Sequence, residues 1–425
     1  MNVQSHHAPA AFAAAMILCP WLPASAAAED GSPIAMDLPP DGARSWPRAC
    51  SLRHALCLRA APGTPPGVQL EVLAAADRAW DTLTSVLRAP APEGPLGDPW
   101  EVFLVDGVDG GARVMPDERD PRSRFDRESS FAMIDPSTPP GCRLDFVLAR
   151  AVAEGSLWRA VPATDIASFR AQSEALARLA TPCAPPTEDD AAFQAEPWRC
   201  LVDPTSAAFD RGASVFVEWV DANFGSEPGA VLVGAWALAP TRTAPGAWRW
   251  PAVPTTFDVL RASLPHAFGR ETTFDDLLAK FAVARASMDP RPALAWRLPW
   301  PTVARRVTPA EPIAPTGVSY VNVDHKNAPP GARLRLEAHW EDYARMRWVV
   351  LKRDALGRTL AELPVTSTDL GTAASLNVEG LDGVDHILIV TQNLGSTEHA
   401  FNPDQGEWEP HGWVLTVEAQ GPFGP

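Results

Sequence analysis

Lysine is scarce in this chain of 425 residues, which has only three lysines (Lys280, Lys326 and Lys352) among its 36 basic residues. The formal net charge is -16, and no stretch gathers Lys and Arg into a cluster. Because nucleic-acid phosphates are bound by clustered basic side chains, this composition argues against a nucleic-acid partner. The scarcity of lysine, together with the abundance of Ala and Pro, indicates a bias of composition and not a function.

Long hydrophobic runs are also missing after the N-terminus, since none approaches about 18 uninterrupted apolar residues, so no transmembrane segment is predicted. The apolar run at 10–22, followed by small residues, is typical of a secretory signal peptide covering residues 1–28, with cleavage near Ala26 or Ala28. A lipid anchor at Cys19 is the less favoured alternative, because no small residue precedes that cysteine directly. The sequence therefore predicts a secreted, periplasmic or cell-envelope protein.

The spacing C-x-x-C does not occur, which argues against a metal site made of cysteines. Five cysteines follow the predicted signal peptide, and an exported protein can form disulfides. Cys50 and Cys57 could close a small local loop. Cys142 and Cys183 bracket two predicted helices, and if these form an antiparallel hairpin the two sulfurs lie near each other. Cys200 would be left over.

The chain is organised around residues 144–158, where apolar residues recur at helical spacing. This stripe consists of Leu144, Val147, Leu148, Ala151 and Val152. A second amphipathic helix is predicted at 166–180, and the short connector makes the pair a helical hairpin. Upstream, the pattern predicts a helix at 68–87 and a strand at 100–105.

The remaining segments suggest an α+β fold with two domains. Residues 29–67 are predicted to be an extended Pro- and Ala-rich segment that adds little to the core, and 68–300 a mostly helical domain. A Pro-rich linker is expected at 301–316. Residues 317–425 contain six or seven short strand-like runs, which favour an all-β immunoglobulin-like sandwich.

This order of helix, strand, polar loop, edge strand, helical hairpin and C-terminal sandwich resembles secreted bacterial metalloproteases of the gluzincin (zincin-like) kind, over residues 68–418. In that family the first hairpin helix carries H-E-x-x-H, whose two imidazoles bind zinc and whose Glu is the general base. The second helix supplies a further Glu ligand. The chain lacks this motif.

The resemblance implies a degenerate site. It places Arg150, Ala151 and Glu154 where His, Glu and His would stand, and Gln172 or Glu174 near the third ligand. An Arg at the first ligand position repels a cation, and Ala151 cannot act as a base. No zinc and no other cofactor is therefore expected, and no catalytic residue is predicted.

Other reactive sites find little support in the sequence. Neither G-x-S-x-G nor a G-x-x-x-x-G-K-[ST] phosphate loop occurs. The pair Asp275-Asp276 is interpreted as a helix start. A metal site could arise by strand pairing, although exposed strand positions explain its residues more simply. These residues are Asp324, His325, Glu337 and His339.

These observations favour a secreted, catalytically inactive metallopeptidase-like protein that binds an unknown protein, peptide or cell-envelope ligand. The alternative is an active hydrolase, most readily a peptidase, with a non-standard site and zinc. A third interpretation, carbohydrate binding through exposed Trp rings, is disfavoured because Trp80, Trp219 and Trp236 lie in apolar helical runs.

Overall fold

The computed structural model describes residues 39, 41–119, 128–160, 165–183, 187–202, 206–235, 257, 260, 273–365, 371–396 and 409–421. It contains both helices and β-sheets, as the predicted α+β class requires. Among the described residues, no helix combines the length and hydrophobicity that a membrane crossing needs. The expected signal peptide, Cys19 and Trp236 lie outside the described residues.

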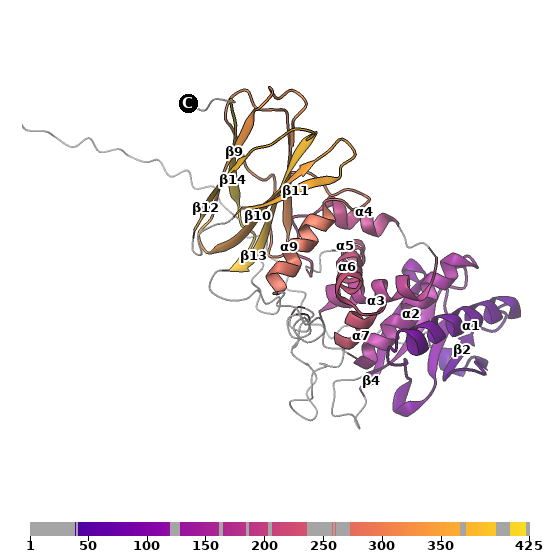
Figure 1. Cartoon of the computed structure of the whole chain (residues 1–425). Helices are drawn as coiled ribbons and strands as arrows, with labels where there is room; N and C mark the ends of the chain where they lie inside the picture. Colours follow the sequence, from indigo (N-terminus) through magenta and orange to yellow (C-terminus); the bar gives the residue numbers. More distant parts are fainter. Residues whose placement is uncertain are drawn as a thin grey trace, which may run out of the picture. The chain divides into compact units, whose positions relative to one another are not determined.

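The N-terminal half contains a five-stranded mixed sheet, of which Figure 1 labels β2 and β4. The strand order is β1-β2-β3-β5-β4. The strands are β1 (Arg48–Cys50), β2 (Leu56–Ala60), β3 (Trp100–Leu104), β4 (Ala112–Arg119) and β5 (Glu128–Ile134). Strands β2, β3 and β5 are parallel, whereas the edge strands β1 and β4 run antiparallel to their neighbours. Side chains alternate between the faces, so Val102 and Leu104 join the core shared with the helices while Phe103 lies in a separate cluster with Phe131.

Three helices pack with this sheet around the main hydrophobic core: α1 (Pro66–Trp80), α2 (Cys142–Ala160) and α3 (Ile166–Ala180). The predicted apolar stripe of α2 is buried in that core along its whole length. Asp165 is the N-cap of α3, and its side chain accepts a hydrogen bond from the backbone N–H of Ser168. It packs along α2 as the second arm of the predicted hairpin.

Both predicted disulfides are present, Cys50–Cys57 and Cys142–Cys183. The second joins the start of α2 to the residues just after α3, which fixes the two helices as antiparallel neighbours. Cys200 belongs to neither bridge. It is buried, and its Sγ accepts a hydrogen bond from Thr316 Oγ1 at 3.3 Å.

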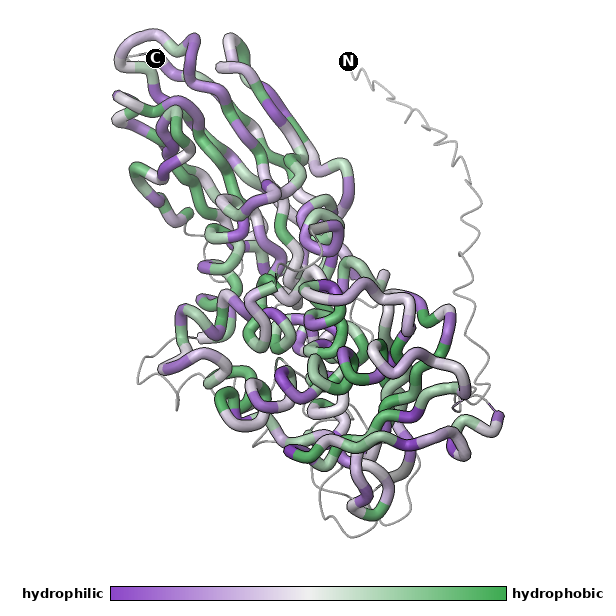
Figure 2. The backbone as a smooth tube through the Cα atoms, turned by 90° about the vertical axis from the view of Figure 1, so that its right-hand side faces the viewer, coloured by the Kyte–Doolittle hydropathy of each residue, from purple (hydrophilic) through white to green (hydrophobic). Residues whose placement is uncertain are grey.

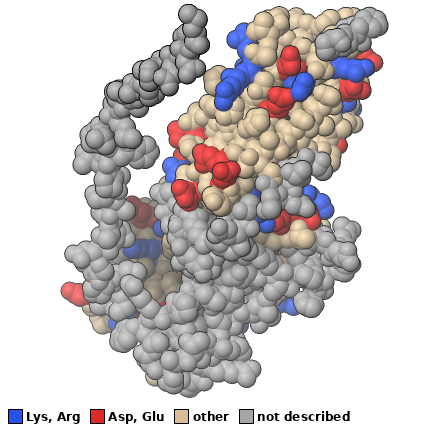
Figure 3. Space-filling model, turned by 90° about the vertical axis from the view of Figure 1, so that its left-hand side faces the viewer, with Lys and Arg blue, Asp and Glu red and all other residues tan. Residues whose placement is uncertain are grey.

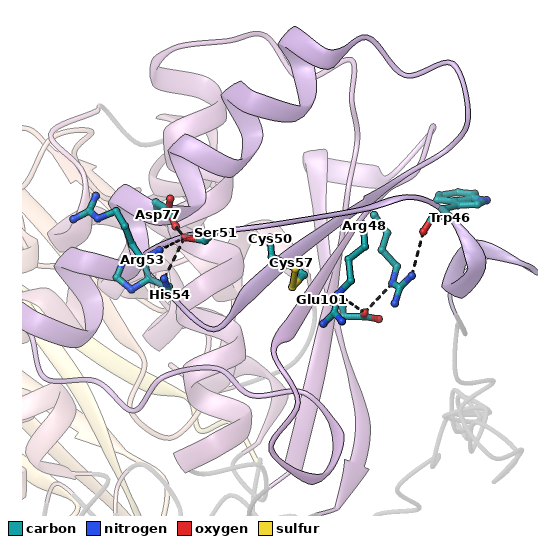
Figure 4. Close-up of a disulfide and its surroundings, with 10 residues drawn as sticks. Trp46, Arg48, Cys50, Ser51, Arg53, His54, Cys57, Asp77 and Glu101 are labelled. Atoms are coloured by element: carbon teal, nitrogen blue, oxygen red, sulfur yellow. Dashed lines mark hydrogen bonds and ion pairs between the residues drawn. A yellow bond between two sulfur atoms is a disulfide. The ribbon is translucent and has the colours of Figure 1, made fainter.

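The prediction that residues 29–67 add little to the core is wrong for β2, whereas β1 has no buried side chain. Leu56 and Leu58 are almost fully buried, because β2 pairs with β3 inside the sheet. Figure 4 shows how the disulfide closes the β1–β2 hairpin beside α1. Ser51 Oγ donates to Asp77 Oδ1 of α1 at 2.7 Å and accepts the backbone N–H of His54 at 3.2 Å. The missed signal is the short apolar alternation in LCLRA.

A second helical cluster follows the hairpin. Its helices are α4 (Thr187–Ala195), α5 (Ala207–Gly212), α6 (Ser214–Phe224), α7 (Ala230–Ala235) and α9 (Phe274–Arg285). α5 packs tightly on α4 at Gly212, where an added Cβ would lie only 2.2 Å from the backbone oxygen of Asp189. The pair Asp275-Asp276 lies in the first turn of α9, as predicted, and Thr273 caps this helix, since its Oγ1 accepts the backbone N–H of Asp276 at 3.1 Å.

The C-terminal half consists of two sheets that share one core. Their orders are β11-β10-β13-β8-β6 and β12-β9-β14-β7. The strands are β6 (Trp296–Leu298), β7 (Arg305–Val307), β8 (Val318–Asp324), β9 (Arg333–Trp340), β10 (Ala344–Arg353), β11 (Thr359–Val365), β12 (Ala373–Val378), β13 (His386–Ser396) and β14 (Trp413–Gln420). In β9, buried residues alternate with more exposed ones, and Figure 2 shows this alternation of hydropathy along the sandwich strands.

Two expectations for this half need correction. Residues 301–316 are not only a linker, because β7 pairs with β14. The predicted helical domain also ends before residue 300, because β6 pairs with β8 of the sandwich. A strand of three residues with Arg and Pro in or beside it shows too little hydrophobic periodicity to be recognised in the sequence. In addition, α9 packs on the outer face of the β11-β10-β13-β8-β6 sheet, where Tyr320 OH donates to the carbonyl oxygen of Ala282 at 2.8 Å.

Candidate functional site

The candidate site is centred on Arg150 of α2. We call Arg150, Glu154 and Glu174 together the Arg150 cluster. Arg150 Nε lies 3.9 Å from Glu154 Oε1, and Arg150 Nη1 lies 3.9 Å from Glu174 Oε2 on α3. Arg150 is 8% exposed and Glu174 is fully buried. Three of the residues selected from the sequence therefore meet at one point between the hairpin helices.

The helical period explains which selected residues reach this point. Arg150 and Glu154 are one turn apart and share a face of α2. Ala151 is turned about 100° from Arg150, and its methyl group lies in the hydrophobic core. Gln172 is buried on α3 but lies two residues before Glu174, so it points away from that face. Of the two candidates for the third position, Glu174 is the one that the structure brings to Arg150.

A loop before β4 covers Arg150 on its other side. Arg150 Nη2 donates a hydrogen bond to the carbonyl oxygen of Gly110 at 3.0 Å. Gly110 has φ 68°, a backbone conformation that glycine adopts without strain. The guanidinium group is thus held by two carboxylates and one backbone carbonyl, which orients it and limits its motion.

Arg178, one turn after Glu174 on α3, extends the cluster into a network that the sequence analysis missed. Its guanidinium lies 3.6 Å from Glu174 Oε1, 2.6 Å from Asp190 Oδ1 of α4 and 3.3 Å from Glu218 Oε1 of α6. Only the i, i+4 spacing of Glu174 and Arg178 was visible in the sequence. The contacts to α4 and α6 depend on tertiary packing.

A further arginine forms an ion pair with an aspartate of the neighbouring helix α4. Arg211 of α5 donates from Nε and Nη2 to the two oxygens of Asp189, at 2.8 and 2.9 Å. Such a two-pronged pair fixes the geometry of both groups. Burial lowers the pKa of the Arg178 and Arg211 guanidinium groups less than their carboxylate partners raise it, so both pKa values lie above the ordinary one.

The carboxyl groups of this network have pKa values shifted toward neutrality. Burial raises the pKa of Glu154 to about 7, against the opposing effect of Arg150. Burial likewise raises the pKa of Glu218 to about 7, and the pKa of Glu174 is raised for the same reason. Neither carboxylate oxygen of Glu174 accepts a hydrogen bond within the described part of the chain, which adds to the cost of ionising it.

The charges of the network balance only when protons are bound. We call the buried ion network the set formed by three arginines and five acids: Arg150, Arg178, Arg211, Glu154, Glu174, Asp189, Asp190 and Glu218. Three guanidinium groups face five carboxyl groups, so the network is neutral when two carboxyls are protonated. Burial raises the pKa of Glu154 and of Glu218 to about 7 and also raises that of Glu174, so these three glutamates are the groups that bind protons below neutral pH.

Replacing Glu154 by Gln should raise stability at pH 8 but not at pH 4. The folded chain holds the Glu154 proton up to about pH 7, whereas the unfolded chain releases it near the ordinary pKa of 4.5. Stability from this group is therefore complete below pH 4.5 and is lost as the pH rises through 7. The gain at pH 8 should be about 1 to 3 kcal/mol, because one pKa unit corresponds to about 1.4 kcal/mol.

Urea unfolding of Glu154→Gln at pH 4, 6 and 8 measures this effect. Glu71→Gln, on the exposed side of α1, is the matched control and should change stability little at any of these pH values. A Glu154→Gln variant that is less stable than the parent at pH 8 would show that the ion pair with Arg150 outweighs the desolvation of Glu154.

The residues present do not fit a zinc ion. A guanidinium group cannot donate a lone pair to a metal, and Arg150 brings a positive charge to the place between the two glutamates. Among the described residues, no group of three or more His, Cys, Asp or Glu side chains is arranged to hold a metal. The arrangement instead suits a charge-assisted interaction or proton uptake.

The C-terminal metal site considered from the sequence does not form. β8 and β9 lie in different sheets, so Asp324 and Glu337 are not paired neighbours. His325 Nδ1 is 2.8 Å from the carbonyl oxygen of Val384, and Glu337 forms an ion pair with Arg335.

Asp275, assigned to a helix start, contacts Arg345 of β10 at 3.0 Å, so this end of α9 is tied to the sandwich.

Two of the tryptophans weighed for carbohydrate binding fall within described residues. Trp80 is buried in the main core, and Trp219 is partly buried against Phe281. Trp296 of β6 is the exposed tryptophan of the described chain, at 40%. The core assignment is therefore correct for Trp80 and correct in part for Trp219.

Comparison with known proteins adds little to these observations. No protein-family model matches the chain, and no curated protein is similar to it in sequence. Among solved structures, one match is the enzymatically active domain of tailspike protein 4 of bacteriophage CBA120, at 11% identity and a TM-score of 0.18. The match covers 28% of this chain and 18% of the tailspike chain, and at that score it supports no conclusion about fold or function.

Proposed function

We propose that the chain is a secreted, catalytically inactive metallopeptidase-like protein that acts in binding or in a cell-envelope interaction. On this proposal the N-terminal half is zincin-like and the sandwich immunoglobulin-like. The observation that carries it is the Arg150 cluster. Three positions that the resemblance assigns to zinc ligands converge, yet a guanidinium occupies one of them and forms ion pairs with the other two.

The same geometry argues against hydrolysis by the family mechanism. Arg150 supplies a fixed positive charge in place of a metal, without a bound water to activate. Ala151, at the position of the general base, contributes only a methyl group to the hydrophobic core. The scaffold is retained while the chemistry is lost, which is the pattern expected of a protein that binds and does not cleave.

The disulfides and the surface of the sandwich support the binding role. Two disulfides are consistent with an oxidising compartment outside the cytoplasm. On the face drawn in Figure 3, acidic and basic side chains are interspersed over the described surface. A mixed polar surface of this kind suits a partner protein, a peptide or an envelope glycan better than a nucleic acid.

The alternative, an active hydrolase with a non-standard site, has one observation in its favour. Glu154 has a pKa of about 7, and a general acid or base works best when its pKa lies near the operating pH. Metal analysis and a peptide-cleavage assay on the purified protein separate the two functions. We expect far less than one zinc per chain and no cleavage. Stoichiometric zinc, or cleavage that Glu154→Gln abolishes, would overturn the proposed function.

Replacing Arg150 and Glu154 by His should create a zinc site. The two imidazoles would lie one helical turn apart beside Glu174, which is the donor set of known catalytic zinc sites. We expect zinc binding by calorimetry with a Kd below about 10 µM, or about -7 kcal/mol. Ala151 is left unchanged because it lies in the core.

The control for this experiment is the same double variant with Glu174→Gln. Loss of even an outer-shell partner weakens zinc binding about 10- to 100-fold, so loss of a ligand should cost at least that much. A double variant that folds, as judged by circular dichroism, and still binds no zinc would refute the alignment of α2 with a metal-binding helix.

A further inference from the structure

A cavity of about 300 Å³ lies on the outer face of the β11-β10-β13-β8-β6 sheet, beside the C-terminal end of α9. Its floor is formed by residues of β8, β10 and β13, and its wall by the segment 286–297. This volume lies at the lower end of the range of about 300 to 1,000 Å³ that is typical of small-molecule sites. The cavity is far from the buried ion network in sequence and shares no residue with it.

Positive charge dominates the lining of this cavity. Arg291, Arg297, Lys326 and Arg353 contribute four cations against the two carboxylates of Asp324 and Asp385. Neither Arg291 nor Arg297 forms an ion pair with any residue that the structure describes. The excess of positive charge is therefore not neutralised inside the pocket by the described chain.

Arg353 is the deepest of these cations. It is 2% exposed, and its Nη1 and Nη2 donate to the carbonyl oxygen of Ala286 at 3.1 Å and to Ser287 Oγ at 2.8 Å. Its Nε is buried and has no hydrogen-bond partner within the described residues. No described carboxylate pairs with this guanidinium, although a buried charge is normally compensated.

Arg291 lies close enough to Arg353 to act on it. Burial lowers the pKa of the Arg353 guanidinium, and the positive charge of Arg291 lowers that pKa further. Two arginines that face one pocket without a carboxylate between them repel each other. An oxyanion placed between them would remove that repulsion and accept their free N–H groups.

Polar groups of a different kind line the same pocket. Asp385 and His386 are neighbours, with His386 Nδ1 3.3 Å from Asp385 Oδ2, and Asn322 contributes an amide from β8. A carboxylate accepts hydrogen bonds from hydroxyl groups, and amide and imidazole groups can both donate hydrogen bonds to hydroxyl groups and accept them. The pocket thus combines an anion-binding part with a part suited to hydroxyls.

We propose that this pocket binds a compact oxyanion carried by a hydroxylated small molecule, of which a sugar acid is the simplest example. Arg291 and Arg353 bind the carboxylate or phosphate group. Asn322 and Asp385 bind neighbouring hydroxyl groups. This site does not depend on the proposed function, because it involves neither α2 nor α3.

Isothermal titration calorimetry of the full chain with three probes tests the proposal: glucuronate, inorganic phosphate and glucose. We expect glucuronate to bind at least about tenfold more tightly than glucose, the difference of a charge-assisted contact worth about 1.4 kcal/mol or more. Phosphate should bind more weakly than glucuronate, because it engages only the arginines. Absence of binding by both anions overturns the proposal.

Two variants assign the parts of the site. Arg291→Gln, at an exposed position, should weaken both anions at least about tenfold, whereas Arg335→Gln on the opposite sheet should change neither. Asp385→Asn should weaken glucuronate binding, because it removes the carboxylate that binds a hydroxyl group. The same variant should not weaken phosphate binding. Undiminished binding by Arg291→Gln overturns the anion site, and equal effects of Asp385→Asn on both probes overturn the hydroxyl contacts.

Discussion

Replacing Arg178 by Met should destabilise the protein by about 3 to 5 kcal/mol at pH 8, the usual cost of removing one partner from a buried ion pair. Arg178 contacts Glu174, Asp190 and Glu218, and its side chain is only 10% exposed. Without it, the fully buried Glu174 and the partly buried Asp190 and Glu218 lose their shared counter-charge. Because domains are stable by only about 5 to 15 kcal/mol, this loss is a large part of the total.

Urea unfolding followed by tryptophan fluorescence measures this change. The matched control is Arg335→Met, which removes an exposed ion pair with Glu337 and should cost less than about 1 kcal/mol. The loss in Arg178→Met should be smaller at pH 5, since the pKa of Glu218 is about 7 and a protonated carboxyl needs no counter-charge. Equal losses for the two variants would show that Arg178 is not the centre of a buried network.

The hairpin was predictable because its signals are local, whereas the residues of the Arg150 cluster were selected through the resemblance to a zinc-binding helix pair. The stripe from Leu144 to Val152 predicts one buried face of α2, although Phe146 and Arg150 outside the stripe are buried as well. The helical period places Arg150 and Glu154 together. The bridge between Cys142 and Cys183 follows once the second helix is assigned. Each of these inferences needs only the helical period and one short connector.

The parts that the sequence analysis missed depend on contacts between distant segments. β2 is only five residues long, and it is a strand because β1 and β3 flank it. β7 contains Arg305 and Arg306, which gave no reason to expect a strand before its pairing with β14 was known. Asp190 and Glu218 resemble ordinary surface residues in the sequence and become part of a site only through packing of α4 and α6 on Arg178.

Removing the Cys142–Cys183 disulfide by a double Cys→Ala replacement should cost about 4 kcal/mol. The bridge closes a loop with a sequence separation of 41 residues, and a loop of that length restricts the unfolded chain by about that amount. The bridge also holds together the ends of α2 and α3, between which Arg150 and Glu174 are paired. Thermal and urea unfolding of the oxidised parent and of the variant measure the difference.

The Cys50–Cys57 bridge is a control within the same chain. Each of the two bridges joins an exposed cysteine to a buried one, but the sequence separation here is only 7 residues, which predicts a loss of about 2 kcal/mol. If both variants lose the same stability, the loop-closure explanation fails and local packing at Cys57 and Cys183 decides the cost. We expect the Cys142–Cys183 variant to lose more stability, and Arg178→Met to cost less stability in that background than in the parent. Effects of coupled residues on stability are not additive. This result would therefore show that the bridge keeps α2 and α3 close enough for the buried ion network to form.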